Sequence, residues 1–147
     1  MDEHKELDDI ARPLGTRVQR AGLRSLSEPE RVAYLVWAFA HELDNGGADT
    51  FFYNESGRFA EQTVDALQSI AARDLAEALE AVIECFPDGE VPADQDERTE
   101  ALEDAARDLE DVLDELREAY EERGPDRVRK ATLRFYQAQT GTAPAEE

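Results

Sequence analysis

The side chains in this sequence that are most able to do chemistry are carboxylates, and many of them recur at helical spacing. Seven of the acids between residues 100 and 122 recur at steps of 4, 4, 3, 4, 3 and 4 residues, which places these seven on one side of an α-helix. These acids are Glu100, Asp104, Asp108, Asp111, Glu115, Glu118 and Glu122. At a rise of about 1.5 Å per residue, this stripe carries one carboxylate about every 5–6 Å. Like charges at this spacing destabilise a helix by about 0.2–0.5 kcal/mol per pair, so their presence favours a function for the stripe.

The net charge of −20 is concentrated in one part of the chain. Residues 74–122 hold 20 acidic and 3 basic side chains, a net charge of −17, whereas residues 1–73 hold 13 and 8, a net charge of −5. Residues 123–147 hold 3 acidic and 5 basic side chains, a net charge of +2. A surface of this kind repels nucleic acids and anionic membranes and attracts cations. The partners that suit such a surface are cationic: a basic protein, a polyamine or a metal ion. We expect neither direct nucleic-acid binding nor membrane binding.

The acids are also compatible with three situations in which no cationic partner exists. An acidic helix face is usually a solvated face without a specific partner. A salt-adapted proteome also makes protein surfaces acidic, although it would spread the acids evenly rather than concentrate them in residues 74–122. Lastly, basic side chains near the C-terminus could fold back and neutralise the stripe. These are Arg127, Arg129, Lys130 and Arg134.

Few features of the sequence are typical of a catalytic or metal site. Cys85 is the only cysteine and the chain has two histidines, too few for a thiolate or imidazole metal cluster. No second histidine follows His41-Glu42 at metalloprotease spacing, and the Asp94-x-Asp96 pattern lacks the turn glycine of a calcium loop. Surface carboxylates also lack the burial that tunes a pKa for acid–base catalysis. We expect a protein that is not an enzyme and binds no cofactor or metal.

The periodicity of the apolar residues predicts an all-α fold, a compact bundle of about six helices. Ser27 and Glu30 have capping-box spacing and mark one helix start. Before this start, two weakly helical stretches lie on either side of Pro13, which is expected to interrupt them. Apolar residues with steps of 4 and 3 predict one long acidic helix in the C-terminal half, from about 96 to 122. Gly124-Pro125 ends this helix, and a short final helix follows.

These elements suggest three parts of the chain. We predict a helical extension at residues 1–26, a helical domain at residues 27–137 and a disordered tail at residues 138–147. The N-terminus has no signal-peptide pattern, and no run of about 18 apolar residues occurs. We therefore expect a cytoplasmic protein.

A second hypothesis for the function rests on aromatic side chains. A group around Trp37 and Phe51 could line a pocket for a small molecule, although apolar residues at helical spacing usually form the core. The group comprises Trp37, Phe39, Phe51, Phe52 and Tyr53. The alternative to a cationic partner is thus a small-molecule-binding or regulatory helical module.

Several short motifs of the chain resemble one bacterial domain family of unknown function. The most specific of them combine an Asn-Gly-Gly turn with a Phe-Phe-Tyr-Asn segment and a Ser-Gly pair. Their residues include Asn45, Gly46, Gly47, Phe51, Phe52, Asn54 and Gly57. Arg98 and the Leu-rich acidic segment ending at Tyr120 are also similar to this family, and the resemblance covers about residues 30–136. The family includes the DMP-type DNA-mimic proteins.

The resemblance implies an all-helical, non-enzymatic and often dimeric protein whose acidic surface can occupy the DNA-binding face of another protein. Our leading hypothesis is therefore a DNA mimic that binds a basic DNA-binding protein such as a transcription factor, with homodimer formation as a further expectation. The seven stripe acids would take the place of DNA phosphates, and the motif residues would form turns and core that carry the fold.

Overall fold

A computed structural model describes residues 3–104 and 107–141 of the chain. Within these residues there are eight α-helices, three 3-10 helices and no β-strand, so the predicted all-α class is confirmed, with eight helices instead of about six. The α-helices are α1 (Glu3–Ala21), α2 (Glu28–Asn45), α3 (Ala48–Tyr53), α4 (Ala60–Ser69), α5 (Arg73–Glu84), α6 (Gln95–Asp104), α7 (Arg107–Arg123) and α8 (Pro125–Thr140). None of the described helices combines the length and the apolar character that a membrane crossing requires.

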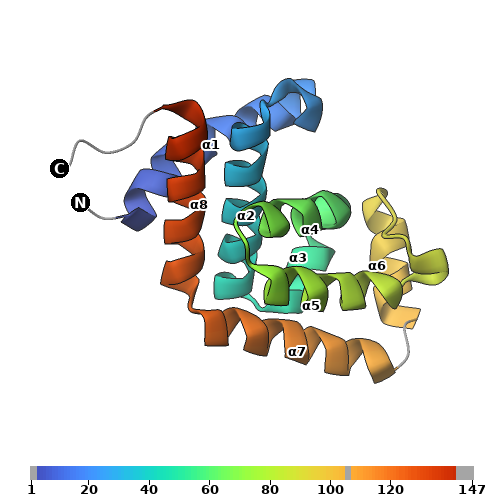
Figure 1. Ribbon diagram of the computed structural model, residues 1–147. Coiled ribbons are helices and arrows are strands. Elements are labelled where there is room, and N and C mark those ends of the chain that lie inside the picture. Colours follow the sequence, from blue (N-terminus) through green and yellow to red (C-terminus); the bar gives the residue numbers. More distant parts are fainter. Residues whose placement is uncertain (1–2, 105–106, 142–147) are drawn as a thin grey trace.

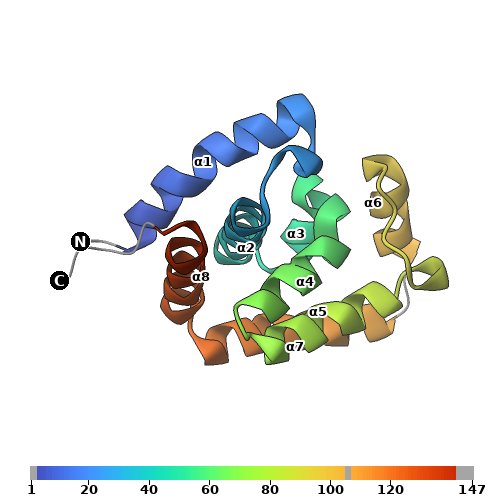
Figure 2. The same cartoon turned by 45° about the horizontal axis from the view of Figure 1, so that its top comes forward.

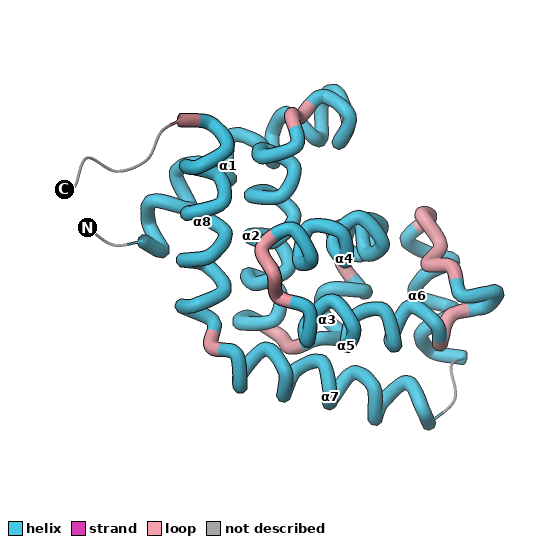
Figure 3. Tube along the Cα trace, in the orientation of Figure 1, coloured by secondary structure: helices cyan, strands magenta, loops and turns pink. Residues whose placement is uncertain are grey.

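Helix α2 forms the centre of the molecule, and α1, α3, α4 and α8 all contact it (Figure 1). Helices α5 and α7 lie side by side along one edge, and α6 stands at the far end of this pair (Figures 1 and 2). The longest connection between described helices, residues 85–94 between α5 and α6, contains the 3-10 helix Pro87–Gly89 (Figure 3). The centre of the core contains Phe39, Phe52 and Leu79, which are all completely buried.

The start of α2 is the capping box that the sequence predicts. The backbone N–H of Ser27 donates to Glu30 Oε1 at 2.9 Å, and the N–H of Glu30 donates to Ser27 Oγ at 3.4 Å. Pro29 lies in the first turn, where its missing N–H removes no helical hydrogen bond. The bond from the Ser27 backbone, together with nearby Arg17, lowers the pKa of Glu30. Two otherwise unpaired N–H groups are thus satisfied at this end of the central helix.

The N-terminal residues form one helix, so the predicted interruption at Pro13 is wrong. Pro13 lies inside α1 on its exposed side, while Leu7, Leu14 and Val18 are buried on the other side. A proline inside a helix costs about 3 kcal/mol, whereas each buried aliphatic side chain contributes about 1.5–3 kcal/mol. Burial against α2 and α8 therefore outweighs the cost of the proline.

The single long helix predicted for residues 96–122 is also wrong, because the structure has two helices there. Helix α6 and helix α7 run in clearly different directions, and the residues between them, 105–106, lie outside the described part (Figures 1 and 2). A straight helix of this length would extend about 40 Å, beyond the about 30 Å diameter of a small domain. Leu102 of α6 and Leu116 of α7 instead join the core as parts of two separate helices, with α6 packed on α3 and α7 packed on α5 and α3.

A partly buried polar contact joins α7 and α8 to the central helix. The hydroxyl of Tyr120 donates to Asp44 Oδ1 at 3.0 Å, and the guanidinium of Arg129 forms an ion pair with Asp44 Oδ2. Burial raises the pKa of Tyr120 well above its ordinary value, so its hydroxyl stays protonated and able to donate. Gly124 adopts φ of +98° between the two helices and allows the sharp change of direction before Pro125. Helix α8 then extends to Thr140, and residues 142–147 of the predicted tail lie outside the described residues.

The capping box predicts a pH-dependent contribution to stability. Because the folded-state pKa of Glu30 is lowered, its contribution is present above the unfolded-state pKa and is lost as the pH falls through the folded-state pKa. Glu30→Gln should therefore lower the free energy of unfolding by about 1 kcal/mol at pH 7, and the difference from the unmodified protein should vanish in acid. Urea unfolding at several pH values measures this, with Glu28→Gln in the same turn as the control. An equal loss at every pH would contradict the prediction.

Candidate acidic interaction surface

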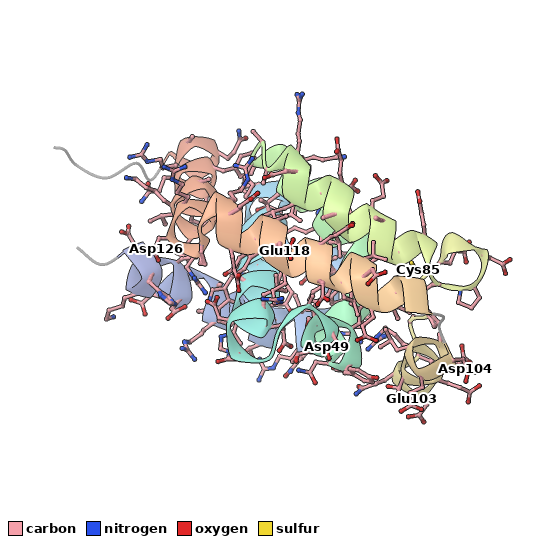
Figure 4. All side chains as sticks on the ribbon, turned by 90° about the horizontal axis from the view of Figure 1, so that it is seen from below. Asp49, Cys85, Glu103, Asp104, Glu118 and Asp126 are labelled. Atoms are coloured by element: carbon pink, nitrogen blue, oxygen red, sulfur yellow. The ribbon has the colours of Figure 1, made fainter. Side chains whose placement is uncertain are left out.

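Two acidic helices, α5 and α7, lie side by side and run in opposite directions. Arg123 at the end of α7 forms an ion pair with Asp74 at the start of α5, with 2.7 Å between Nη2 and Oδ1. Figure 4 looks onto this pair from below and shows Glu118 on α7 and Cys85 just past the end of α5. Each helix buries an apolar side toward the core, with Leu75 and Leu79 on α5 and Leu109 and Leu116 on α7. The opposite sides face solvent.

The solvent-facing sides of the two helices carry carboxylates. We call these residues the acidic face: Glu77, Glu80 and Glu84 on α5, and Asp111, Glu115, Glu118 and Glu122 on α7. All seven side chains are exposed. The four on α7 recur every three or four residues and so lie along one side of that helix. The seven charges span about 17 Å along the helix axis, one per about 2.4 Å.

The stripe predicted from the sequence is therefore divided between two helices. Asp111, Glu115, Glu118 and Glu122 remain together on α7, but Glu100 and Asp104 are exposed on α6 and follow its different direction. The side chain of Asp108 lies outside the described residues. Helix α5 packs beside α7, so its acids lie next to the four acids of α7. The predicted stripe did not include these acids of α5. Only the packing of distant segments reveals this second row.

The acids are poorly compensated by bases. All the described acidic side chains between residues 74 and 122 are exposed. Arg98 is completely buried, and Arg117 lies 4.0 Å from Asp114 and 3.5 Å from Glu121, outside the acidic face. Among the described bases after residue 122, Arg123 forms an ion pair with an acid of residues 74–122, namely Asp74. The acidic face itself has no ion pair among the described side chains.

The C-terminal bases do not neutralise the acidic face in the way that the sequence left open. Arg129 is buried and pairs with Asp44 of α2. Arg127, Lys130 and Arg134 are exposed on α8, and none of the three forms an ion pair with a described acid of residues 74–122. Internal neutralisation by these four residues is therefore excluded for the described side chains.

Arg98 is a buried cation that donates to four backbone carbonyl oxygens, two of them from motif residues. Its Nε donates to the carbonyl of Phe52 at 2.7 Å, and its Nη2 donates to that of Asn54 at 2.8 Å. Its Nη1 donates to the carbonyls of Pro92 and Ala93 at 3.0 and 3.2 Å. Burial lowers the pKa of Arg98. The guanidinium thus fastens α6 and the segment before it to the end of α3, and its charge is withheld from the surface.

The motif glycines allow close approaches that this arrangement needs. A Cβ at Gly57 would lie 2.8 Å from the carbonyl oxygen of Phe51 and 3.0 Å from Nε of Arg98. A Cβ at Gly46 would lie 2.1 Å from Oγ1 of Thr50, so only glycine fits at the turn between α2 and α3. Asn54 also donates to both carboxylate oxygens of Glu42, at 3.0 and 3.1 Å. The motif residues therefore form the turn between α2 and α3 and part of the packing around Arg98, and they do not belong to the acidic face.

The sequence model of the DMP19-like protein family matches residues 24–139. The chain belongs to the DMP19-like protein family. No curated protein and no solved structure matches the chain. The family match includes the Arg98 site and the whole acidic face, and it begins after α1.

The aromatic residues of this DMP19-like chain do not form one pocket. Phe51 is 1% exposed and packs edge-to-face on Phe39 and Phe52, so these rings belong to the core. Trp37 lies apart from them, where its indole N–H donates to Asp8 at 2.7 Å and its ring stacks on His41. In the part of the chain that the structure describes, no group of three or more His, Cys, Asp or Glu side chains could hold a metal ion.

The structural role of Arg98 was not predicted from the sequence. The sequence feature that could have indicated it is the rarity of bases around it, because residues 74–122 contain three bases and twenty acids. A lone arginine in such a segment favours either an unusual surface charge or a buried, hydrogen-bonded role. The carbonyls that surround it come from residues about 45 positions earlier as well as from its own neighbourhood, so the sequence could not distinguish these roles.

The carbonyl cage predicts a large effect of replacing Arg98. Arg98→Leu leaves at least three buried or half-buried carbonyls without their donor, and should lower the free energy of unfolding by about 3 kcal/mol or more. Arg98→Lys should lower the free energy of unfolding by less than Arg98→Leu but still measurably, because an ammonium cannot reproduce the planar fork of donors. Urea unfolding measures both, with Arg117→Leu as the exposed control, for which we expect a change of at most about 1 kcal/mol. Similar losses at the two positions would show that the cage contributes little.

Proposed function

We propose that this protein is a non-enzymatic interaction protein that uses its acidic face as a DNA mimic. The face would occupy the DNA-binding surface of a basic protein, such as a transcription factor, in place of duplex DNA. The observation that carries the proposal is the set of seven exposed carboxylates on two adjacent helices, none of which pairs with a base among the described side chains. The proposed setting is the cytoplasm, and homodimer formation stays a prediction.

The charge density of the acidic face supports this proposal. One charge per about 2.4 Å is close to the one charge per about 1.7 Å of duplex DNA, both strands counted. A basic surface that recognises phosphates through arginine and lysine can pair with carboxylates of similar spacing, because both groups accept charge-assisted hydrogen bonds. Complementary charge also speeds the encounter of the two proteins.

The placement of the other charges supports the same function. The chain buries Arg98 and directs Arg129 to Asp44, so two cations that could have neutralised the surface are used inside the fold. A face that only needed solvation could carry ion pairs of alternating sign, which would stabilise its helices. Membership of the DMP19-like family agrees with the proposal, since the motifs of the chain resemble a family that includes DNA-mimic proteins.

A capture experiment with matched variants tests the proposal. One variant, Glu115→Gln/Glu118→Gln/Glu122→Gln, removes three charges from the acidic face. The control, Glu28→Gln/Glu61→Gln/Asp65→Asn, removes three exposed charges elsewhere, so both variants have a formal net charge of −17 instead of −20. Each immobilised protein is exposed to the lysate of the encoding organism at low salt and then eluted with duplex DNA. Circular dichroism checks that both variants are folded.

The proposal predicts that basic DNA-binding proteins bind to the unmodified chain and to the control, and that duplex DNA releases them. Binding to the acidic-face variant should fall by about tenfold, because each lost charge pair weakens a largely electrostatic complex. Equal capture by the two variants would show that only the net charge matters. Bound proteins that duplex DNA fails to release would exclude competition for a DNA-binding surface.

A further inference from the structure

A groove runs along a different side of α7 from the acidic face. It lies between α7, α6 and the turn that leads from α2 into α3, and has a volume of about 570 Å³. We call it the lateral groove; its walls include Asp49, Tyr53, Glu103, Glu110, Leu113 and Asp114. The midpoint of Glu110 and Asp114 lies about a quarter turn around α7 from the midpoint of Glu115 and Glu118, since successive residues rotate by about 100°, and Asp114 borders the acidic face. The groove is therefore a separate surface from the acidic face.

The floor of the lateral groove is apolar and partly open. Leu102 and Leu109 form its base, and each is 7% exposed. Leu113 is half-buried beside them. Tyr53, at 37%, is the one large hydrophobic side chain among the described residues that is classed as exposed, and it lines this groove. An amide hydrogen bond from Gln95 to the carbonyl of Tyr53, at 3.0 Å, holds α6 beside the aromatic residue.

The rim of the lateral groove is acidic. Asp49, Glu103, Glu110 and Asp114 are all exposed there, and Arg117 is the one base among the described residues that line the groove. Arg117 is already drawn to Asp114 and Glu121, at 4.0 and 3.5 Å. A cation entering the groove would therefore meet several carboxylates and an aromatic ring, the surroundings that favour arginine or lysine. The apolar floor adds a preference for a neighbouring aliphatic side chain.

We propose that the lateral groove binds a basic segment of the partner protein in which arginine stands beside a large aliphatic residue. The arginine contacts Tyr53 and the rim carboxylates, and the aliphatic side chain covers Leu113. This inference rests on the proposed function and deepens it, because it gives the partner a second contact that duplex DNA lacks. Charge alone attracts any basic protein, whereas a shaped apolar contact discriminates among them.

Two short peptides of equal charge test the groove directly. The probes are acetyl-Leu-Arg-Arg-Leu-amide and acetyl-Gly-Arg-Arg-Gly-amide, titrated at low salt into the isotope-labelled full chain and followed by NMR. We expect the leucine peptide to bind about tenfold more tightly, because only it covers the apolar floor. Its chemical-shift changes should cluster at Gly46, Gly47, Tyr53 and Leu113. Equal affinities, or shift changes confined to the acidic face, would overturn the proposal.

Variants of the full chain separate the groove from the acidic face. Tyr53→Ala changes an exposed side chain and should reduce the affinity for the leucine peptide by about three- to fivefold. Glu110→Gln/Asp114→Asn should reduce it by about fivefold or more, whereas Glu115→Gln/Glu118→Gln, which changes the net charge equally, should reduce it less than about twofold. Equal effects of the two double variants would overturn the proposal.

The two proposals fail separately. If the two peptides bind equally but duplex DNA still releases captured proteins, only the role of the lateral groove is excluded. If the leucine peptide binds in the lateral groove but duplex DNA releases no captured protein, the DNA-mimic function is excluded instead.

Discussion

Repulsion among the carboxylates of α5 and α7 is the constraint that the rest of the fold must overcome. Four pairs of like charges at i, i+4 spacing on α7, from Glu110/Asp114 to Glu118/Glu122, cost about 1–2 kcal/mol in total. Burial of Leu109 and Leu116 contributes about 3–6 kcal/mol and so outweighs this cost. The acidic helices are therefore held by their apolar sides, and their charged sides are left free to face solvent.

Buried cations connect this surface to the interior. Arg98 satisfies carbonyls of α3 and of the segment before α6, and Arg129 satisfies Asp44 beside Tyr120. Both arginines stabilise junctions between helices, and neither pairs with a carboxylate of the acidic face. Gly57 and Asn54 of the sequence motif lie against the first of these junctions. The motif thus carries the fold, and the fold in turn positions the acidic face and the lateral groove.

Local patterns in the sequence predicted most of the helices, because caps and turns depend on nearby residues. The Ser27–Glu30 capping box, the Asn-Gly-Gly turn and the break at Gly124 occur as expected. Pro13 and the division of residues 96–122 could not be foreseen, since tertiary packing decided them. The same limit applies to the acidic face. Four acids of the predicted stripe remain together on α7, but the neighbouring acids belong to α5, and the periodicity of one helix cannot identify which other helix packs beside it.

The salt dependence of the complex with a captured DNA-binding protein tests the central claim most directly. If carboxylates of the acidic face replace phosphates, the affinity should fall at least about tenfold between about 50 and 200 mM salt, and removal of the charges of Glu115, Glu118 and Glu122 should flatten this dependence. An affinity that stays constant over this range, or a dependence unchanged in that variant, would contradict the claim that these carboxylates act in place of phosphates.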